Sequence, residues 1–265
     1  MVPIVLTVAG SDPSGGAGLQ ADLKTILRHE AYGAAVATLL TVQDTRGVQS
    51  VEVLSVALVR TQLESLLEDM TPQAAKTGAL GSPDIVREVG LVAKAASFPW
   101  VVDPVLGPSR GERLSTDDLA EALRTDLIPF ATLITPNAAE AAELSGLPVR
   151  SVEEAATAAG RIASFGAKAV LVTGGHLEGA AQGTDLLLYE GVVRELPARL
   201  LALGDFHGTG CALSSAIASR LAHGDDVPTA VARAKDWLEG ALTHAFTVGK
   251  GARPVNHLWD VDRKP

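Results

Sequence analysis

Residues 4–30 read IVLTVAGSDPSGGAGLQADLKTILRHE and contain three successive patterns. The first six, IVLTVA (4–9), are almost continuously apolar, which is typical of a strand covered on both faces. A loop with four glycines (10–18) follows, and residues 18–30 then place apolar side chains at helical spacing with polar residues between them. A strand joined to a helix through a glycine-rich turn is the building unit of α/β proteins, so this stretch predicts that class.

The same alternation continues along the chain. Further strands are predicted over 35–42, 74–78, 100–105, 132–137 and 169–175. Further helices are predicted over 59–70, 83–96, 116–128, 138–144, 152–165, 208–223 and 227–248. One stretch, 184–196, departs from the alternation and predicts an antiparallel hairpin around Glu190-Gly191. We expect a three-layer α/β/α fold with a mostly parallel central sheet, formed as a single domain by residues 1–265, because no linker or repeat divides the chain.

The charge balance excludes several classes of partner. The 265 residues include 22 lysines and arginines against 31 aspartates and glutamates, a net charge of −9, whereas nucleic acid and anionic membranes attract basic surfaces. The single cysteine, Cys211, excludes an internal disulfide, and the sequence has no zinc-binding motif. The first apolar run is too short for a signal peptide, and no run reaches the length of a membrane span. We expect a cytoplasmic protein that binds neither nucleic acid nor membrane.

Polar and glycine residues follow each predicted parallel strand. The carboxyl ends of parallel strands meet at one edge of a sheet, where α/β proteins bind their ligands. Six segments should converge there: GSD (10–12), QD (43–44), TG (77–78), DP (103–104), PN (136–137) and GGH (174–176).

The segment GDFHGTGCALSSAIA (204–218) contains a glycine turn that leads directly into a helix of small residues. The backbone N–H groups of Gly208, Thr209, Gly210 and Cys211 would point outward at the positive end of the helix dipole, which predicts an anion hole. Cys211 stands in the first helical turn, where thiol pKa values tend to fall, so its thiolate would be able to take a proton beside a transferring phosphoryl group. The alternative is a buried, inert cysteine at a well-packed helix start.

The glycine loop (10–18) resembles a phosphate-binding loop without matching a known one. No Lys-Ser or Lys-Thr follows its glycines as in a Walker A loop, and the spacing G-x-G-x-x-G is not met. Asp44 lies where a dinucleotide-binding protein carries its ribose-binding acid, which makes a Rossmann dehydrogenase a rival. The G-T-G-C turn (208–211) has no place in that scheme and argues against it.

Asn137 and Glu140 are separated by one helical turn at the predicted ligand edge. A carboxylate there can orient Mg²⁺ through water, because Mg²⁺ keeps several of its waters and takes one or two protein carboxylates. Asparagine before a helix is also a common N-cap, and this interpretation carries the greater weight for Asn137 taken alone. Asp103, before Pro104, is either a carboxylate beside the metal or an ordinary turn residue.

Taken together, these segments resemble the hydroxymethylpyrimidine/phosphomethylpyrimidine kinases of thiamine biosynthesis, which are members of the ribokinase-like superfamily. The resemblance runs the length of the chain in eight blocks that follow the order of the family: AGSDPSGGAGLQADLKT (9–25), YGAAVATLLTVQDTRGVQSV (32–51), KTGALGS (76–82), VVDPV (101–105), LITPNAAEAAEL (133–144), TGGHLEG (173–179), HGTGCALSSAIA (207–218) and GKGARPVNHLW (249–259). It implies a ribokinase-like fold and transfer of the γ-phosphoryl group of ATP to 4-amino-5-hydroxymethyl-2-methylpyrimidine and then to its monophosphate. It also implies Mg²⁺, with a monovalent cation as a further candidate, and a homodimer.

The resemblance also assigns roles to single residues. Gln43 and Asp22 would hydrogen-bond the aminopyrimidine or its hydroxymethyl group, and its pocket would be lined by Gly10, Thr41, Ala79 and Val105. The nucleotide would be bound by Asn137, Glu140, Thr173 and His207, and Mg²⁺ would be held by Glu140 and Asp103 through water. The anion hole would be formed by Gly208, Thr209 and Gly210. Cys211 stands where related sugar kinases carry an aspartate base, and a modest base suffices because phosphoryl transfer depends mainly on positioning.

Five positions depart from the family pattern. Ala79 replaces a methionine that often packs on the pyrimidine, Asp44 replaces an asparagine, Ser109-Arg110 replaces Lys-Ser, and Thr173 replaces a lysine. The loss of two lysines weakens the positive surroundings expected for a phosphorylated substrate, which Arg110 and Lys250 would restore in part.

Two alternatives to the pyrimidine kinase are considered. Pyridoxal kinase activity occurs on the same fold, and TVQ (41–43) and PVNH (254–257) favour the pyrimidine over it. A non-catalytic ligand-binding relative is the second alternative. The joint presence of Cys211, Asn137 and Glu140 argues against it.

Overall fold

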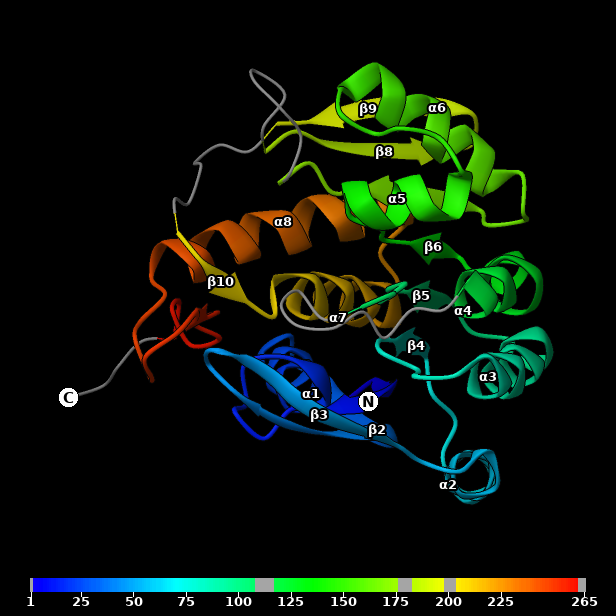
Figure 1. Cartoon of the computed structure of the whole chain (residues 1–265), viewed down its shortest axis with the longest axis vertical. Coiled ribbons are helices and arrows are strands. Elements are labelled where there is room, and N and C mark those ends of the chain that lie inside the picture. The colour runs from blue at the N-terminus through cyan, green and yellow to red at the C-terminus, as the bar shows by residue number, and fades with distance from the viewer. Residues whose placement is uncertain (1, 108–116, 176–182, 198–203, 262–265) are drawn as a thin grey trace.

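The computed structural model describes residues 2–107, 117–175, 183–197 and 204–261. Within these residues, nine strands form one sheet in the order β3-β2-β1-β4-β5-β6-β7-β8-β9 (Figure 1). The strands are β1 Ile4–Ser11, β2 Tyr32–Asp44, β3 Gly47–Val53, β4 Ala74–Thr77, β5 Trp100–Val102, β6 Leu133–Ile134, β7 Ala169–Val172, β8 Asp185–Tyr189 and β9 Val192–Leu196. The strands from β2 to β7 along this order are parallel, and β3, β8 and β9 pair antiparallel at the two edges.

Helices cover both faces of the sheet, as the sequence predicts. They are α1 Gly18–Arg28, α2 Val56–Asp69, α3 Pro83–Ala95, α4 Asp117–Ala122, α5 Ala138–Ser145, α6 Val152–Ala163, α7 Thr209–Ala222 and α8 Val227–Thr243. In Figure 1, α3 and α4 lie on one side of β4 and β5, and α7 lies on the other. The three-layer α/β/α architecture is therefore confirmed.

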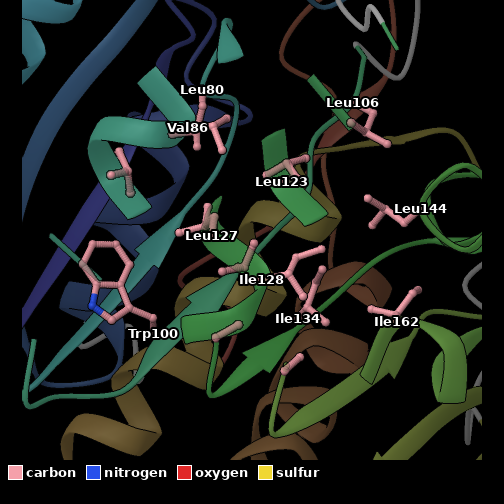
Figure 2. Close-up of a cluster of buried hydrophobic side chains, with 14 of the residues drawn as sticks. Leu80, Val86, Trp100, Leu106, Leu123, Leu127, Ile128, Ile134, Leu144 and Ile162 are labelled. Carbon is pink, nitrogen blue, oxygen red and sulfur yellow. The ribbon is translucent and has the colours of Figure 1, made fainter. Parts of the chain in front are cut away.

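The central strands alternate their side chains between two apolar cores. Val102 and Ile134 belong to the core formed with α2 to α6, whereas their neighbours Val101 and Leu133 belong to the core formed with α1, α7 and α8. Figure 2 shows the first of these cores. Because successive strand residues point to opposite faces, burial on both faces requires the continuous apolar runs seen in the sequence.

The two edges of the sheet contain antiparallel hairpins, of which one was predicted. The turn between β8 and β9 has positive φ at Glu190 (50°) and Gly191 (74°), the backbone that a tight two-residue hairpin turn requires. At the other edge, β3 extends the sheet with residues 47–53, which no strand was predicted to contain. Its side chains are half-buried or exposed, so it needs no continuous apolar run and its signal in the sequence is weak.

Two helices end five or more residues before the predicted position. The helix expected over 116–128 ends as α4 at Ala122 and continues as a π turn (Leu123–Leu127) and a 3₁₀ turn (Ile128–Phe130), where Pro129 supplies no N–H for a longer helix. The last helix, α8, ends at Thr243 instead of Val248. The C-terminal segment binds its final turn, because the backbone N–H of Asn256 donates to the Ala241 carbonyl at 3.1 Å.

The C-terminal segment also forms a short parallel pair that the sequence did not predict. Arg253–Pro254 (β11) pairs with Phe206–His207 (β10), directly before α7. The Arg253 guanidinium lies over the Phe206 ring, 4.8 Å from its centroid. The entry to α7 is therefore held by residues more than forty positions further along the chain. None of the helices described in this structure is both long and apolar enough to cross a bilayer.

Candidate active site

The N-terminus of α7 lies against the glycine loop. Gly208 has φ = +82°, and a Cβ placed there would come within 1.8 Å of the Gly16 carbonyl oxygen, so only glycine fits. No side chain caps the helix at this position. The free N–H groups at the start of the helix therefore lie between the glycine loop and Asp103, whose carboxylate oxygens are 3.7 and 3.9 Å from the position of a Cβ at Gly210.

Cys211 lies in the first turn of α7, where it was predicted, but its pKa moves in the opposite direction from the one predicted. Burial raises the pKa of the thiol to about 12. Lys76 lowers it, and the negative charges of Asp22 and Asp103 raise it further. The helix dipole is outweighed because desolvation and two carboxylates both disfavour a thiolate. In the unliganded chain the thiol is protonated.

Asp22 and Lys76 form a fully buried ion pair. Lys76 Nζ lies 2.8 and 2.9 Å from the two carboxylate oxygens of Asp22, and both side chains have 0% exposed surface. Thr7 Oγ1 and Ser215 Oγ donate to the same carboxylate at 2.6 and 2.8 Å. Both oxygens of Asp22 thus bind groups from β1, β4 and α7, and its predicted contact with the substrate stays a prediction.

Lys76 received no role from the sequence, although a signal for it was present. It is the one charged residue in the buried strand AAKT (74–77). A charge in a strand covered on both faces has to be paired, since an isolated buried ammonium is prohibitively costly. The pattern thus pointed to a carboxylate partner beside the site, and Asp22 is that partner.

Asp103 and Glu140 place two carboxyl groups next to the start of α7. Ser214 Oγ donates to Asp103 at 3.2 Å. Burial raises the pKa of Asp103 to about 6, with Lys76 opposing that shift, and burial together with the charge of Asp103 raises the pKa of Glu140 to about 8. Both would ionise more readily with a cation between them.

Asn137 and Glu140 form a capping box at the start of α5, which confirms the N-cap interpretation. The Asn137 side chain accepts from the N–H groups of Ala139 (2.9 Å) and Glu140 (3.0 Å), and Glu140 accepts from the Asn137 N–H at 2.9 Å. Thr173 lies beside them, because its N–H donates to the Pro136 carbonyl at 2.9 Å and it bridges to Asn137. Three of the four residues predicted to bind the nucleotide are thus brought together.

The fourth, His207, lies elsewhere. Its Nε2 is 2.7 Å from Gln43 Nε2 and 2.9 Å from Asp12 Oδ2. A Cβ at Gly16 would meet the imidazole at 2.6 Å, so the ring packs on the glycine loop. The structure therefore places His207 with Gln43, on the side predicted to bind the substrate, and not with the other three residues predicted to bind the nucleotide.

The remaining predicted residues lie around Gln43 and Asp103. Thr41 Oγ1 donates to the Ser11 carbonyl (3.0 Å), the Ala79 carbonyl accepts from Thr38 (2.6 Å), and the Val105 N–H donates to the Asp103 carbonyl (2.9 Å). Gly10 packs against Leu39, since a Cβ there would lie 2.4 Å from its Cδ1. Asp44 pairs with Arg46 in the β2–β3 turn. Ser109, Arg110 and His176 lie outside the described residues.

Among the described residues, no cluster of three or more histidines, cysteines, aspartates and glutamates is arranged to hold a metal ion.

The sheet edge, the exposed helix N-terminus and the paired carboxyl groups define a phosphotransferase with a ribokinase-like fold. The model of the phosphomethylpyrimidine kinase family matches residues 12–256, and the chain belongs to that family.

Three similar proteins were compared with the chain. The hydroxymethylpyrimidine/phosphomethylpyrimidine kinase of Streptomyces coelicolor is 44% identical over 257 residues, which cover 97% of this chain and 95% of that protein. The phosphomethylpyrimidine kinase of Clostridium difficile 630 superimposes with a TM-score of 0.78 at 38% identity, covering 89% of this chain and 97% of the other. The pyridoxal kinase of Bacillus subtilis, solved as an ADP complex, has a TM-score of 0.89 at 32% identity and covers 97% and 98%.

Proposed function

We propose that this enzyme transfers the γ-phosphoryl group of ATP to 4-amino-5-hydroxymethyl-2-methylpyrimidine and then to its monophosphate, in thiamine biosynthesis. The observation that carries the proposal is the arrangement around the start of α7. Gln43 and His207 lie on one side of it, and Asp103 and Glu140 lie on the other. An acceptor and a phosphoryl donor bound on these two sides would meet at the helix N-terminus. The family and the name of the Streptomyces coelicolor relative support this substrate.

Each part of the site has a distinct task in this proposal. Gln43 orients the aminopyrimidine, whose edge offers a donor and an acceptor together. The N–H groups of Gly208, Thr209 and Gly210 stabilise the charge on the transferring phosphoryl group. Cys211 first loses its own proton to solvent, and its thiolate then takes the proton of the hydroxymethyl group. Asn137 and Thr173, together with Glu140, lie on the side assigned to the nucleotide phosphates.

The two carboxyl groups fit a hydrated Mg²⁺ ion. Asp103 and Glu140 are hard oxygen donors, and burial raises the pKa values of both side chains, so a bound cation would favour their ionised forms. When bound, Mg²⁺ would neutralise charge on the nucleotide phosphates. Thr173, which replaces the lysine of the family pattern, makes this neutralisation more important here.

The stability of the enzyme without metal is expected to fall as pH rises through the neutral range. The folded-state pKa values of Asp103 (about 6) and Glu140 (about 8) lie above their ordinary values of 3.8 and 4.5, so the folded chain keeps protons that the unfolded chain has lost. The stabilisation from these two groups is complete at pH values below their ordinary pKa values. It is lost as pH rises through their folded-state pKa values. Between about pH 6 and about pH 8.5 in EDTA, Tm should fall by about 2–4 °C or more.

Mg²⁺ should raise Tm more at the higher pH, because deprotonation and metal binding are linked. Calorimetric scans with EDTA and with Mg²⁺ at both pH values measure this difference. Glu140→Gln is the matched control, since its pH dependence and its Mg²⁺ response should both shrink. An Mg²⁺ shift of equal size at both pH values would contradict the assignment.

The second candidate function is pyridoxal kinase. It is favoured by the TM-score of 0.89 with the Bacillus subtilis pyridoxal kinase, although identity to the Clostridium difficile phosphomethylpyrimidine kinase is higher, at 38% against 32%. We expect kcat/KM to be at least about tenfold higher for the pyrimidine alcohol, a difference of about 1.4 kcal/mol in transition-state binding. Steady-state assays with both alcohols measure it, and a higher value for pyridoxal would reverse the choice.

We also propose, from the family resemblance, that the enzyme is a cytoplasmic homodimer and that a monovalent cation assists it. Each chain has a mass of 27.3 kDa, so light scattering of the purified protein distinguishes one chain from two. Assays with K⁺ replaced by tetramethylammonium test the cation.

A further inference from the structure

Asp12 is an ionised hydrogen-bond acceptor at the centre of the glycine loop. Its carboxylate accepts from the Ser14 N–H (2.8 Å), Ser14 Oγ (3.0 Å) and the Ala17 N–H (2.8 Å), and its side chain is 4% exposed. Burial alone would raise the pKa of Asp12, but the hydrogen bonds from His207, Ser14 and Ala17 hold it below the usual 3.8. A carboxylate in this state can only accept hydrogen bonds.

This state fixes the proton on His207. Nε2 of the imidazole lies 2.9 Å from Asp12 Oδ2, so Nε2 must carry a hydrogen, whether the ring is neutral or charged. A protonated ring nitrogen has no lone pair to accept with. Gln43 therefore cannot donate an N–H to the same Nε2, although its amide lies 2.7 Å away.

The orientation of the Gln43 amide follows from the same argument. The oxygen and nitrogen of an amide have nearly the same shape, so hydrogen bonding decides which faces a given neighbour. Only the oxygen can accept from His207 Nε2–H, so Asp12 Oδ2 and the Gln43 oxygen share this hydrogen in a three-centre bond, and the amide nitrogen is left on the far side. Gln43 is half-buried, and in the described part of the chain its amide has His207 as its partner.

We propose that Asp12 and His207 act as positioning residues that hold the Gln43 amide with its oxygen toward His207 and its N–H groups toward the substrate. A bound substrate then has to present a hydrogen-bond acceptor, such as a ring nitrogen, to the Gln43 N–H groups. The second lone pair of the amide oxygen is still free to accept from an exocyclic amine beside that ring nitrogen. The proposal rests on the proposed function for the identity of the substrate, but the proton on His207 is a property of the free chain.

The imidazole is well placed to act in this way because it is held from two sides. The glycine loop packs on its ring at Gly16, and its backbone pairs with Pro254 in the β10–β11 pair. The ring therefore cannot turn away from Asp12 without displacing the loop. This also explains why the C-terminal segment, which contributes no predicted catalytic group, contacts the site.

The first test reads the tautomer directly. In the chain labelled with ¹⁵N-histidine, at a pH where the imidazoles are neutral, the Nε2 resonance of His207 should have the shift of a protonated, pyrrole-type nitrogen. The resonance is assigned to His207 by its absence from the spectrum of the His207→Gln variant. A pyridine-type Nε2 would overturn the proposal, and this result does not depend on which substrate the enzyme phosphorylates.

The second test uses a pair of substrates. The first substrate is the pyrimidine alcohol. The second is its analogue, in which C–H replaces the ring nitrogen beside the amino-bearing carbon. We expect the wild-type kcat/KM to be about 100-fold lower for this analogue, because the Gln43 N–H is left without an acceptor. In the His207→Leu variant the Gln43 amide is free to turn. The kcat/KM for the pyrimidine alcohol should then exceed that for the analogue by less than about tenfold. His207→Gln, which keeps an N–H donor, should restore most of the wild-type ratio of the two kcat/KM values.

Ser14→Ala is the matched control, because it removes one bond to Asp12 without touching the contact between Asp12 and His207. Its ratio should equal the wild-type ratio. An unchanged ratio in His207→Leu would overturn the proposal, as would a reduced ratio in Ser14→Ala equal to that in His207→Leu. If the wild-type enzyme phosphorylates neither compound, the proposed function fails, and the tautomer measurement still decides the orientation.

Discussion

Replacing Lys76 with methionine should lower the free energy of unfolding by about 3–5 kcal/mol. The substitution keeps most of the side-chain volume but removes the cation beside Asp22, whose side chain has 0% exposed surface and, among the described residues, keeps the hydrogen bonds from Thr7 and Ser215. An unpaired buried charge is far more costly than the loss of a surface ion pair. Urea unfolding followed by circular dichroism measures the difference.

Two further variants separate charge pairing from packing. Lys94 is an exposed lysine on α3, and Lys94→Met should change the stability by no more than about 0.5 kcal/mol. The double variant Asp22→Asn with Lys76→Met removes both charges and should recover about half or more of the loss. A single Lys76→Met variant as stable as the wild type would contradict a buried, ionised pair.

The sequence predicts the strands that are buried on both faces of the sheet. β1, β4 and β7 are covered on both faces, and their apolar runs are unmistakable for that reason. The edge strand β3 and the short pair of β10 with β11 have no such constraint. Their positions depend on pairing with residues distant in the sequence, and local patterns carry no information about that pairing.

In the candidate site, too, local features are predicted from the sequence and contacts between distant residues are not. The position of a residue at a strand end is a local property, so Gln43, Asp103 and Asn137 were found from the sequence. The partners of a side chain are not local. The placement of His207 beside Gln43 and the pairing of Lys76 with Asp22 join residues 164 and 54 positions apart. The direction of the Cys211 pKa shift likewise depends on burial and on two carboxylates that no motif places near the thiol.

Replacing Cys211 with alanine should lower kcat by about 10²-fold or more, the range typical of losing a general base, and leave nucleotide binding nearly unchanged. Single-turnover assays and ATP titrations measure the two quantities. Asn137 and Thr173, which lie on the nucleotide side, have no contact with the thiol among the interactions of the described residues. A Cys211→Ala variant with wild-type turnover would exclude the thiol as the base.

The pH dependence of kcat gives a sharper test of the same role. Burial raises the pKa of the Cys211 thiol to about 12, so below that value the thiolate fraction grows about tenfold for each pH unit. If bound substrates leave this environment unchanged, kcat of the wild-type enzyme should still be rising at about pH 9. Glu140, with a pKa of about 8, adds a rise that levels off above that value. Glu140 is present in both proteins, so its contribution cancels in the ratio of the wild-type rate to the Cys211→Ala rate. If this ratio does not increase with pH, Cys211 does not accept the proton of the hydroxymethyl group.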